Sequence, residues 1–189
     1  MIVIGASLGG MKALRWIITA LPSSFPLPIV AILHRHKESD EALVELLQVD
    51  ARLPVSEVID KEPIQPGHMY VAPADYHLFI EREYFSLSTD ELVQYARPSI
   101  DVVFESAADT FGENVIGIIL TGANQDGSKG AMRIKDRGGL IIVQDPESAE
   151  CPIMPAAVLQ CVHADYIRPV EEIGQLLLRL AVNRTSIPR

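Results

Sequence analysis

The sequence predicts an α/β protein in three αβα layers, with a doubly wound, mostly parallel sheet and an antiparallel hairpin at its edge. Short strand-like runs that are apolar on both faces alternate with amphipathic segments that have helical spacing. Prolines and glycines divide the middle of the chain into short strand-like pieces. Because strands buried on both faces need helices on both sides, these observations favour a parallel sheet between two helical layers.

The first third of the chain contains two buried strands, each followed by a helix. The strands are expected at 2–5 and 29–33, and the helices at 9–21 and about 40–49. Pro22 ends the first helix because proline cannot continue a helix.

The middle of the chain is expected to form a meander or hairpin set along one edge of the sheet. Its short strands are expected at 55–59, 69–72, 78–81 and 84–87. Prolines and a glycine at 54, 63, 66, 67 and 73 mark the turns.

The alternation of strands and helices resumes in the second half. Helices are expected at about 99–111, 129–137, 155–159 and 170–180, and strands at 115–120, 140–143 and 166–168. The chain has no repeat or low-complexity segment, so one domain over residues 1–189 is expected.

The charge and composition of the chain disfavour several classes of partner and location. The formal net charge of −9 disfavours nucleic acid and anionic lipid as partners, since no cluster of Lys and Arg offsets it. Apolar runs are too short to cross a bilayer and the first residues lack a secretory signal, so we expect a cytoplasmic protein with no membrane insertion. Cys151 and Cys161 are expected to be reduced thiols, and the acidic composition and single core favour a monomer.

Three polar loops follow buried strands directly, and a parallel sheet brings such loops to one rim. They are residues 5–10, 34–36 and 121–127. The first loop fits the pattern G-x-S-x-G, which places Ser7 on a sharp strand-to-helix turn between small neighbours. A serine there lies beside free amides of the helix N-terminus, which stabilise an oxyanion.

A serine nucleophile needs a base and a carboxylate to orient that base. His34 is the first residue beyond its strand, and Asp126 lies in the glycine-flanked loop beyond another strand. The chain order Ser, His, Asp differs from those of α/β-hydrolases, chymotrypsin and subtilisin, so a different fold family is required. The residues predict a serine esterase that uses Ser7, His34 and Asp126.

Each of these residues also has a non-catalytic interpretation. The Ser7 turn fits a phosphate-binding turn, His34 could cap a strand, and Asp126 could be a helix N-cap or a turn residue. His36 is an alternative base, and His77 could line the pocket mouth. No metal-ligand spacing such as H-E-x-x-H occurs, so neither a metal nor a cofactor is expected.

Longer motifs carry a family resemblance from Ile2 to about Leu180. They are Ile4-Gly5-Ala6-Ser7-Leu8-Gly9-Gly10, Leu33-His34, 66–73 with His77, 97–104, Leu120-Thr121-Gly122 with Asp126-Gly127, and Gln144-Asp145 with Met154-Pro155. In these motifs the chain resembles the catalytic domain of the bacterial chemotaxis protein-glutamate methylesterases.

The resemblance implies hydrolysis of glutamate methyl esters on the cytoplasmic helices of chemoreceptors to glutamate and methanol, and in some members deamidation of receptor glutamines. It implies the parallel-sheet α/β fold and assigns nucleophile, base and carboxylate to Ser7, His34 and Asp126. Candidates for the oxyanion hole and pocket are Leu8, Gly9, Gly122 and Ala123. Family members commonly carry an N-terminal receiver domain, which we expect to be absent because the chain begins with the first strand.

The sequence departs from the family pattern near the site. Leu8 replaces the usual threonine, Leu33 replaces the usual glutamine, and the usual loop Thr-Gly-Met-Gly-Asn-Asp-Gly reads Thr-Gly-Ala-Asn-Gln-Asp-Gly at 121–127. Positive charge near the cleft is expected from Arg35, Lys37 and Arg97. Two alternatives stay open: a catalytically idle, partner-binding domain of the same fold, which the changed loop supports, and a phosphate- or nucleotide-binding α/β module.

Overall fold

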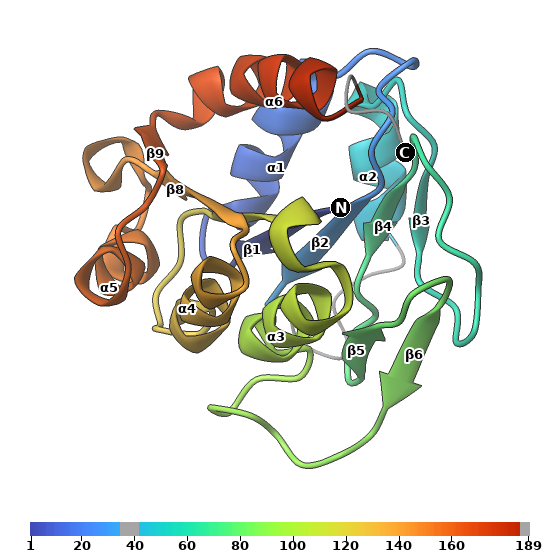
Figure 1. Cartoon of the computed structure of the whole chain (residues 1–189), viewed down its shortest axis with the longest axis horizontal. Coiled ribbons are helices and arrows are strands. Elements are labelled where there is room, and N and C mark those ends of the chain that lie inside the picture. Colours follow the sequence, from blue (N-terminus) through green and yellow to red (C-terminus); the bar gives the residue numbers. More distant parts are fainter. Residues whose placement is uncertain (35–41, 186–189) are drawn as a thin grey trace.

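The computed structural model describes residues 1–34 and 42–185 and confirms the predicted fold class (Figure 1). A seven-stranded sheet has the order β3-β4-β2-β1-β7-β8-β9, and all its neighbouring strands pair in parallel. Its strands are β1 (Ile2–Ala6), β2 (Ile29–Leu33), β3 (Val55–Glu57), β4 (Met69–Val71), β7 (Ile116–Ile119), β8 (Leu140–Gln144) and β9 (Tyr166–Arg168).

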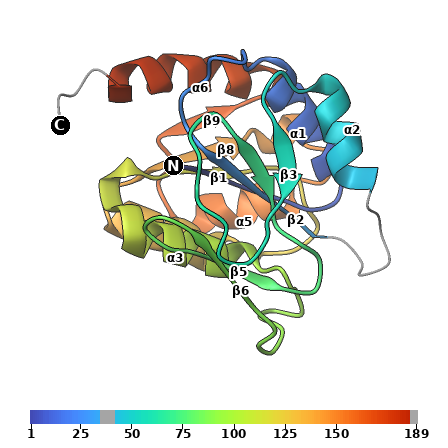
Figure 2. The ribbon, with the colours of Figure 1, turned by 90° about the vertical axis from the view of Figure 1, so that its right-hand side faces the viewer.

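Helices cover both faces of the sheet (Figures 1 and 2). One layer holds α1 (Gly10–Thr19), α2 (Ala42–Asp50) and α6 (Val170–Thr185). The opposite layer holds α3 (Ile100–Phe111), α4 (Ser128–Asp136) and α5 (Ile153–Cys161). Two 3-10 turns complete the chain, η1 (Gly112–Asn114) and η2 (Pro146–Ser148).

The central strand β1 shows why the strand sequences are apolar throughout. Ile2 and Ile4 pack in the core on the α1 side of the sheet, whereas Val3 packs in the core on the α3 side. Since side chains alternate between the faces of a strand, both sets must be apolar. A Cβ on Gly5 would lie 2.5 Å from Cγ2 of Ile100, so only glycine lets α3 pack this closely on the strand.

The antiparallel pair exists, but its place differs from the prediction. β5 (His77–Ile80) and β6 (Phe85–Ser88) form a separate two-stranded sheet beside α3 instead of extending the main sheet. β3 and β4, which we expected in the same meander, join the main sheet in parallel. The burial of every residue of β4 explains this, because a strand inside a parallel sheet is covered on both faces.

The three central strands bring the candidate residues together. From β1 the chain continues to β2 on one side, while β7 lies on the other, which makes this the topological switch point of the sheet. The amide of His34 donates to the carbonyl of Ala6 (3.1 Å), and the amide of Ser7 donates to the carbonyl of Thr121 (3.0 Å). The loops after β2, β1 and β7 are therefore held side by side.

Candidate active site

Ser7 lies on a tight turn whose glycines have identifiable tasks. Gly9 has a φ of 78°, a left-handed conformation that favours glycine, and Gly10 donates its amide to the carbonyl of Ser7 at 2.8 Å. A Cβ on Gly10 would lie 2.6 Å from Cδ1 of Leu33 and 2.7 Å from Cβ of Ala6. The two glycines thus let the first turn of α1 start directly above the strand ends.

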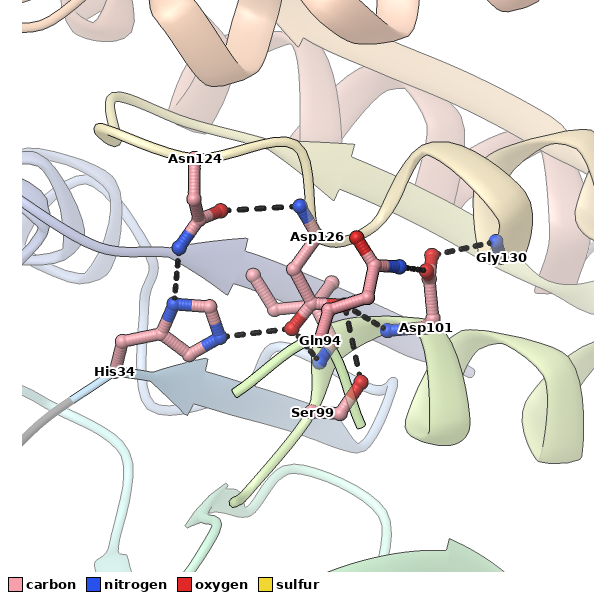
Figure 3. A network of polar contacts seen from close by, with 8 residues as sticks. His34, Gln94, Ser99, Asp101, Asn124, Asp126 and Gly130 are labelled. Carbon is pink, nitrogen blue, oxygen red and sulfur yellow. Dashed lines mark hydrogen bonds and ion pairs between the residues drawn. The ribbon is translucent and has the colours of Figure 1, made fainter. Parts of the chain in front are cut away.

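His34 and Asp126 form a hydrogen-bonded pair, with 2.8 Å between Nε2 and Oδ2 (Figure 3). The Asp126 carboxylate also accepts hydrogen bonds from the Ser99 hydroxyl (3.0 Å) and from the amides of Ile100 (2.7 Å) and Asp101 (2.9 Å). Those two amides are at the start of α3 and have no acceptor within the helix, so a residue from a distant loop supplies it. Asp126 is therefore not the N-cap of the helix that follows it, which begins after Gly127; its carboxylate instead binds amides of α3 and pairs with histidine.

The surroundings keep Asp126 ionised. Burial, which leaves the residue only 1% exposed, opposes its ionisation, but the hydrogen bonds from His34 and from the amides of Asp101 and Ile100 outweigh burial. Its pKa is therefore lowered from the ordinary aspartate value. An ionised carboxylate accepts from the N–H at Nε2 of His34, which leaves Nδ1 as the unprotonated nitrogen of the neutral ring.

Nδ1 of His34 lies 2.8 Å from Nδ2 of Asn124, a contact that the sequence did not predict (Figure 3). The amide oxygen of Asn124 accepts from the backbone amide of Asp126 at 3.0 Å. In the sequence, Asn124 stands out only because loop 121–127 departs from the family pattern. That departure does not predict a contact with His34.

Ser7 and His34 line the same cavity of about 560 Å³, together with Leu33 and the first turns of α1. The hydroxyl of Ser7 makes no hydrogen bond to His34 in the described part of the chain. The structure therefore places a hydroxyl and an imidazole on one cavity, with the carboxylate behind the imidazole.

The chain is similar to known proteins over nearly its whole length. The profile of the CheB methylesterase family matches residues 2–177. The chain belongs to the CheB methylesterase family. It is 43% identical to a putative protein-glutamate methylesterase/protein-glutamine glutaminase of Leptospira interrogans, over 96% of this chain and 95% of that protein.

A second relative of the CheB family comes from Thermotoga maritima. The chain is 36% identical to its protein-glutamate methylesterase/protein-glutamine glutaminase and spans about half of that longer protein (53%). The crystal structure of the Thermotoga maritima CheB methylesterase catalytic domain superposes with a TM-score of 0.92 at 36% identity, covering 95% of this chain and 97% of that one.

Within this CheB methylesterase fold, the oxyanion-hole candidates divide into two groups. The amide of Gly122 donates to the carbonyl of Cys151 (3.1 Å), so Gly122 packs beside Ser7 without offering a free amide donor. The amides of Leu8, Gly9 and Ala123 make no hydrogen bond with any described residue. They remain the candidate donors.

The hydroxyl of Thr121 holds the Ser7 turn in place, a role that the sequence did not predict. It donates to the carbonyl of Leu8 at 2.8 Å and accepts from the amide of Cys151 at 2.8 Å. Since a trans peptide directs its C=O and N–H in opposite directions, the bond to Leu8 also fixes the direction of the Gly9 N–H. The side chain of Gln144 in turn accepts from the amide of Thr121 (2.9 Å).

Two other predicted residues, His77 and Arg97, are engaged elsewhere. His77 is 2% exposed and hydrogen-bonded to the carbonyl of Glu91, so the expectation that it lines the pocket mouth is wrong. Arg97 is paired with Asp75 at 2.6 Å and also binds two loop carbonyls, so it fixes loops instead of supplying a free charge. Arg35, His36 and Lys37 lie outside the described residues.

The described residues also bear on metal binding, membrane crossing and disulfide pairing. Over residues 1–34 and 42–185, His, Cys, Asp and Glu side chains do not gather in the groups of three or more that could hold a metal ion. None of the described helices is both long and apolar enough to cross a bilayer. Cys151 and Cys161 are free thiols, as predicted.

Asp101 is a second buried carboxyl beside this CheB family site. It accepts from the side chain of Gln94 (2.6 Å) and from the amide of Gly130 (2.8 Å). Burial and the nearby charge of Asp126 raise its pKa to about 6.

Proposed function

We propose that this chain hydrolyses glutamate γ-methyl esters on chemoreceptors to glutamate and methanol, with Ser7 as nucleophile, His34 as base and Asp126 as the residue that orients the base. The observation that carries the proposal is the His34–Asp126 pair at the wall of the cavity that also holds Ser7. The substrate class is supported by relatives named protein-glutamate methylesterase that match nearly the whole chain.

The contacts of His34 support the following order of proton transfers. Because Nε2 of His34 is bonded to Asp126, Nδ1 takes the proton of Ser7 as the hydroxyl oxygen attacks the ester carbonyl. The amides of Leu8 and Gly9 hold the oxyanion, at about 3 kcal/mol per donor. Collapse of the intermediate breaks the bond to the methoxy oxygen, which leaves as methanol with the proton from His34. Water then cleaves the acyl-serine by the same steps.

The same residues can act on a glutamine side chain. Attack on the amide carbonyl gives the same acyl-serine, and the leaving nitrogen takes its proton from His34 and departs as ammonia. The proposal therefore includes deamidation of receptor glutamines, in line with the glutaminase part of the relatives' names.

A phosphate-binding role for the Ser7 turn is disfavoured by a neighbouring acid. The carboxylate of Glu150 lies beside Gly9, where a Cβ would be 3.0 Å from its Oε2. A carboxylate at this end of α1 repels a phosphate that the helix N-terminus would otherwise attract.

The decisive experiment measures methanol release from a methylated chemoreceptor with the wild-type chain and with Ser7→Ala. We expect loss of methanol release in Ser7→Ala with an unchanged circular dichroism spectrum, because the hydroxyl is not used in packing. Equal activity of the two chains would remove Ser7 from the mechanism.

Labelling with a fluorophosphonate separates the proposal from the two alternatives. An active hydroxyl and base give a covalent adduct at Ser7, which mass spectrometry locates. An idle domain or a phosphate-binding module gives no adduct.

A further inference from the structure

Both ring nitrogens of His34 are already hydrogen-bonded in this structure (Figure 3). Nε2 donates to Asp126 and Nδ1 accepts from the side-chain amide of Asn124, each at 2.8 Å. An unprotonated imidazole nitrogen has a single lone pair in the ring plane, so it accepts one well-aligned hydrogen bond. The nitrogen that must take the proton of Ser7 is therefore occupied.

The orientation of the Asn124 amide is fixed by its other end. Its oxygen accepts from the backbone amide of Asp126, two residues further along the chain, at 3.0 Å. This contact is the side-chain turn that Asn readily forms, and it leaves the NH₂ group facing His34. If the amide were flipped, two N–H donors would face each other, so the network determines the assignment.

From these contacts we infer that Asn124 is a positioning residue that holds the base nitrogen of His34 in the resting enzyme and must release it before Ser7 is activated. The inference rests on the proposed function and adds a step to it, the release of His34 by Asn124 before the reaction. The Ser7 hydroxyl and the Asn124 amide compete for one lone pair, and the hydroxyl has no bond to His34 in the described structure.

The contact also opposes the protonated ring that forms during the reaction. An imidazolium carries N–H at both nitrogens, and the one at Nδ1 would point at the NH₂ of Asn124. Asn124 must then swing away or turn its oxygen to the ring, and either motion breaks or weakens its bond to the amide of Asp126. The resting arrangement therefore slows the first chemical step.

The test compares Asn124→Ala and Asn124→Gly with the wild-type chain in fluorophosphonate labelling of Ser7 and in hydrolysis of p-nitrophenyl acetate. We expect both rates to rise about 2- to 10-fold, with KM for the ester little changed, which corresponds to one net hydrogen bond. Gln125→Gly is the matched control, because Gln125 is exposed in the same loop and its replacement loosens the backbone without touching His34. Rates that stay equal or fall in both Asn124 variants would overturn the inference.

Asn124→Asp supplies a readout that a purely structural role would not move. Its carboxylate retains an oxygen for the amide of Asp126 and turns the other toward Nδ1, where it attracts a proton to the ring. We expect the pH–rate profile of this variant to move to higher pH. An unmoved profile would contradict the contact.

Nitrogen-15 NMR of the His34 ring, assigned by loss of its signals in His34→Gln, tests the contact without any activity. The Nδ1 signal should shift in Asn124→Ala and stay in Gln125→Gly; an unchanged signal would contradict the inference. If no variant labels at Ser7, the proposed function fails while the NMR result still decides the contact. If all label at the same rate, the function stands and the control by Asn124 fails.

Discussion

At the scale of single residues, Asp126 joins the site to the fold. The same carboxylate that holds His34 also accepts the two amides at the start of α3 and the hydroxyl of Ser99. A change at this residue must therefore affect both stability and chemistry, whereas a change at Ser99 removes one neutral donor and leaves the pair with His34.

Asp126→Asn should lose both functions of the carboxylate. We expect about 2–4 kcal/mol of lost stability, because the charge-assisted bonds to buried amides weaken. We also expect labelling of Ser7 to slow by about 10³- to 10⁴-fold, because an amide at this position no longer fixes the reactive tautomer of His34. Urea unfolding and labelling kinetics measure the two effects.

Ser99→Ala is the control for this variant, with an expected cost of about 1 kcal/mol and less than about 10-fold in rate. Equal losses of labelling in the two variants would argue against a specific pairing of Asp126 with His34.

Asp101 gives a prediction about pH. Burial raises its pKa to about 6, so between about pH 4 and 6 the folded chain keeps a proton that the unfolded chain has lost. This group therefore makes stability fall as the pH rises through that window. Asp101→Asn should lack this fall, so the wild type should lose about 1–3 kcal/mol more than the variant between pH 4 and pH 7. Parallel pH dependences in urea unfolding would contradict the raised pKa.

The sequence predicted, for a physical reason, that three candidate residues lie near one another, and the structure brings them together. Ser7, His34 and Asp126 each follow a buried strand, and a parallel sheet brings the ends of such strands together. The contact of Asn124 with His34 and the binding of the first amides of α3 by Asp126 could not be predicted, because they depend on how loop side chains meet residues far away in the sequence.

At the scale of elements, the contact of α3 with α4 holds the start of α3 in place. A Cβ on Gly130 of α4 would lie 2.4 Å from Cβ of Phe104 and 3.1 Å from the carbonyl of Asp101. The two helices are thus closer than a side chain at residue 130 allows, and the first turn of α3 binds Asp126.

Gly130→Ala should push α3 away from α4. Alanine is the better helix former by about 1 kcal/mol, but the overlap with Phe104 costs more, so we expect a net loss of about 1–3 kcal/mol. The displaced first turn of α3 should also weaken the support of Asp126, so labelling of Ser7 slows even in fully folded protein.

Gly174→Ala is the matched control, since a Cβ on Gly174 of α6 would lie 2.5 Å from Cβ of Ala20, away from the site. It should lose stability while the labelling rate of the folded protein stays the same. A labelling rate that is equally slow in both variants would mean that α3 has no special part.

At the centre of the sheet, the strands predicted at 2–5, 29–33 and 115–120 correspond to β1, β2 and β7. β1, β2 and β7 are continuous apolar runs, and their helices have a regular apolar face. β3 and β4 have only three residues each and lie between prolines, a pattern that parallel and antiparallel strands share. β4 pairs with β2, and β3 pairs with β4. These contacts between distant segments are not contained in local patterns.

At the scale of the whole molecule, the cavity combines apolar side chains with two basic ones on an acidic protein. Lys12 and Arg15 line it, while the net charge of the chain is −9. Arg15 is paired with Asp50, and Lys12 has no ion pair with any described residue. Leu8, 56% exposed, lines the same cavity as Lys12, and Trp16, 50% exposed, lines a neighbouring hollow with Lys12 and Arg15.

This charge distribution predicts how the substrate is recognised. Each hydrolysed ester leaves a glutamate, so the receptor surface becomes anionic and Lys12 becomes an attractive contact. Lys12→Gln should lower the ratio of receptor to p-nitrophenyl acetate hydrolysis by about 3-fold at low salt, and the difference should disappear near 0.5 M salt, where charges are screened beyond about 4 Å. Arg82→Gln, an equal change of charge at the exposed turn of the β5–β6 hairpin, should leave the ratio unchanged. If both variants lower it equally, the net charge of the molecule governs encounter with the receptor and the cavity has no local part in it.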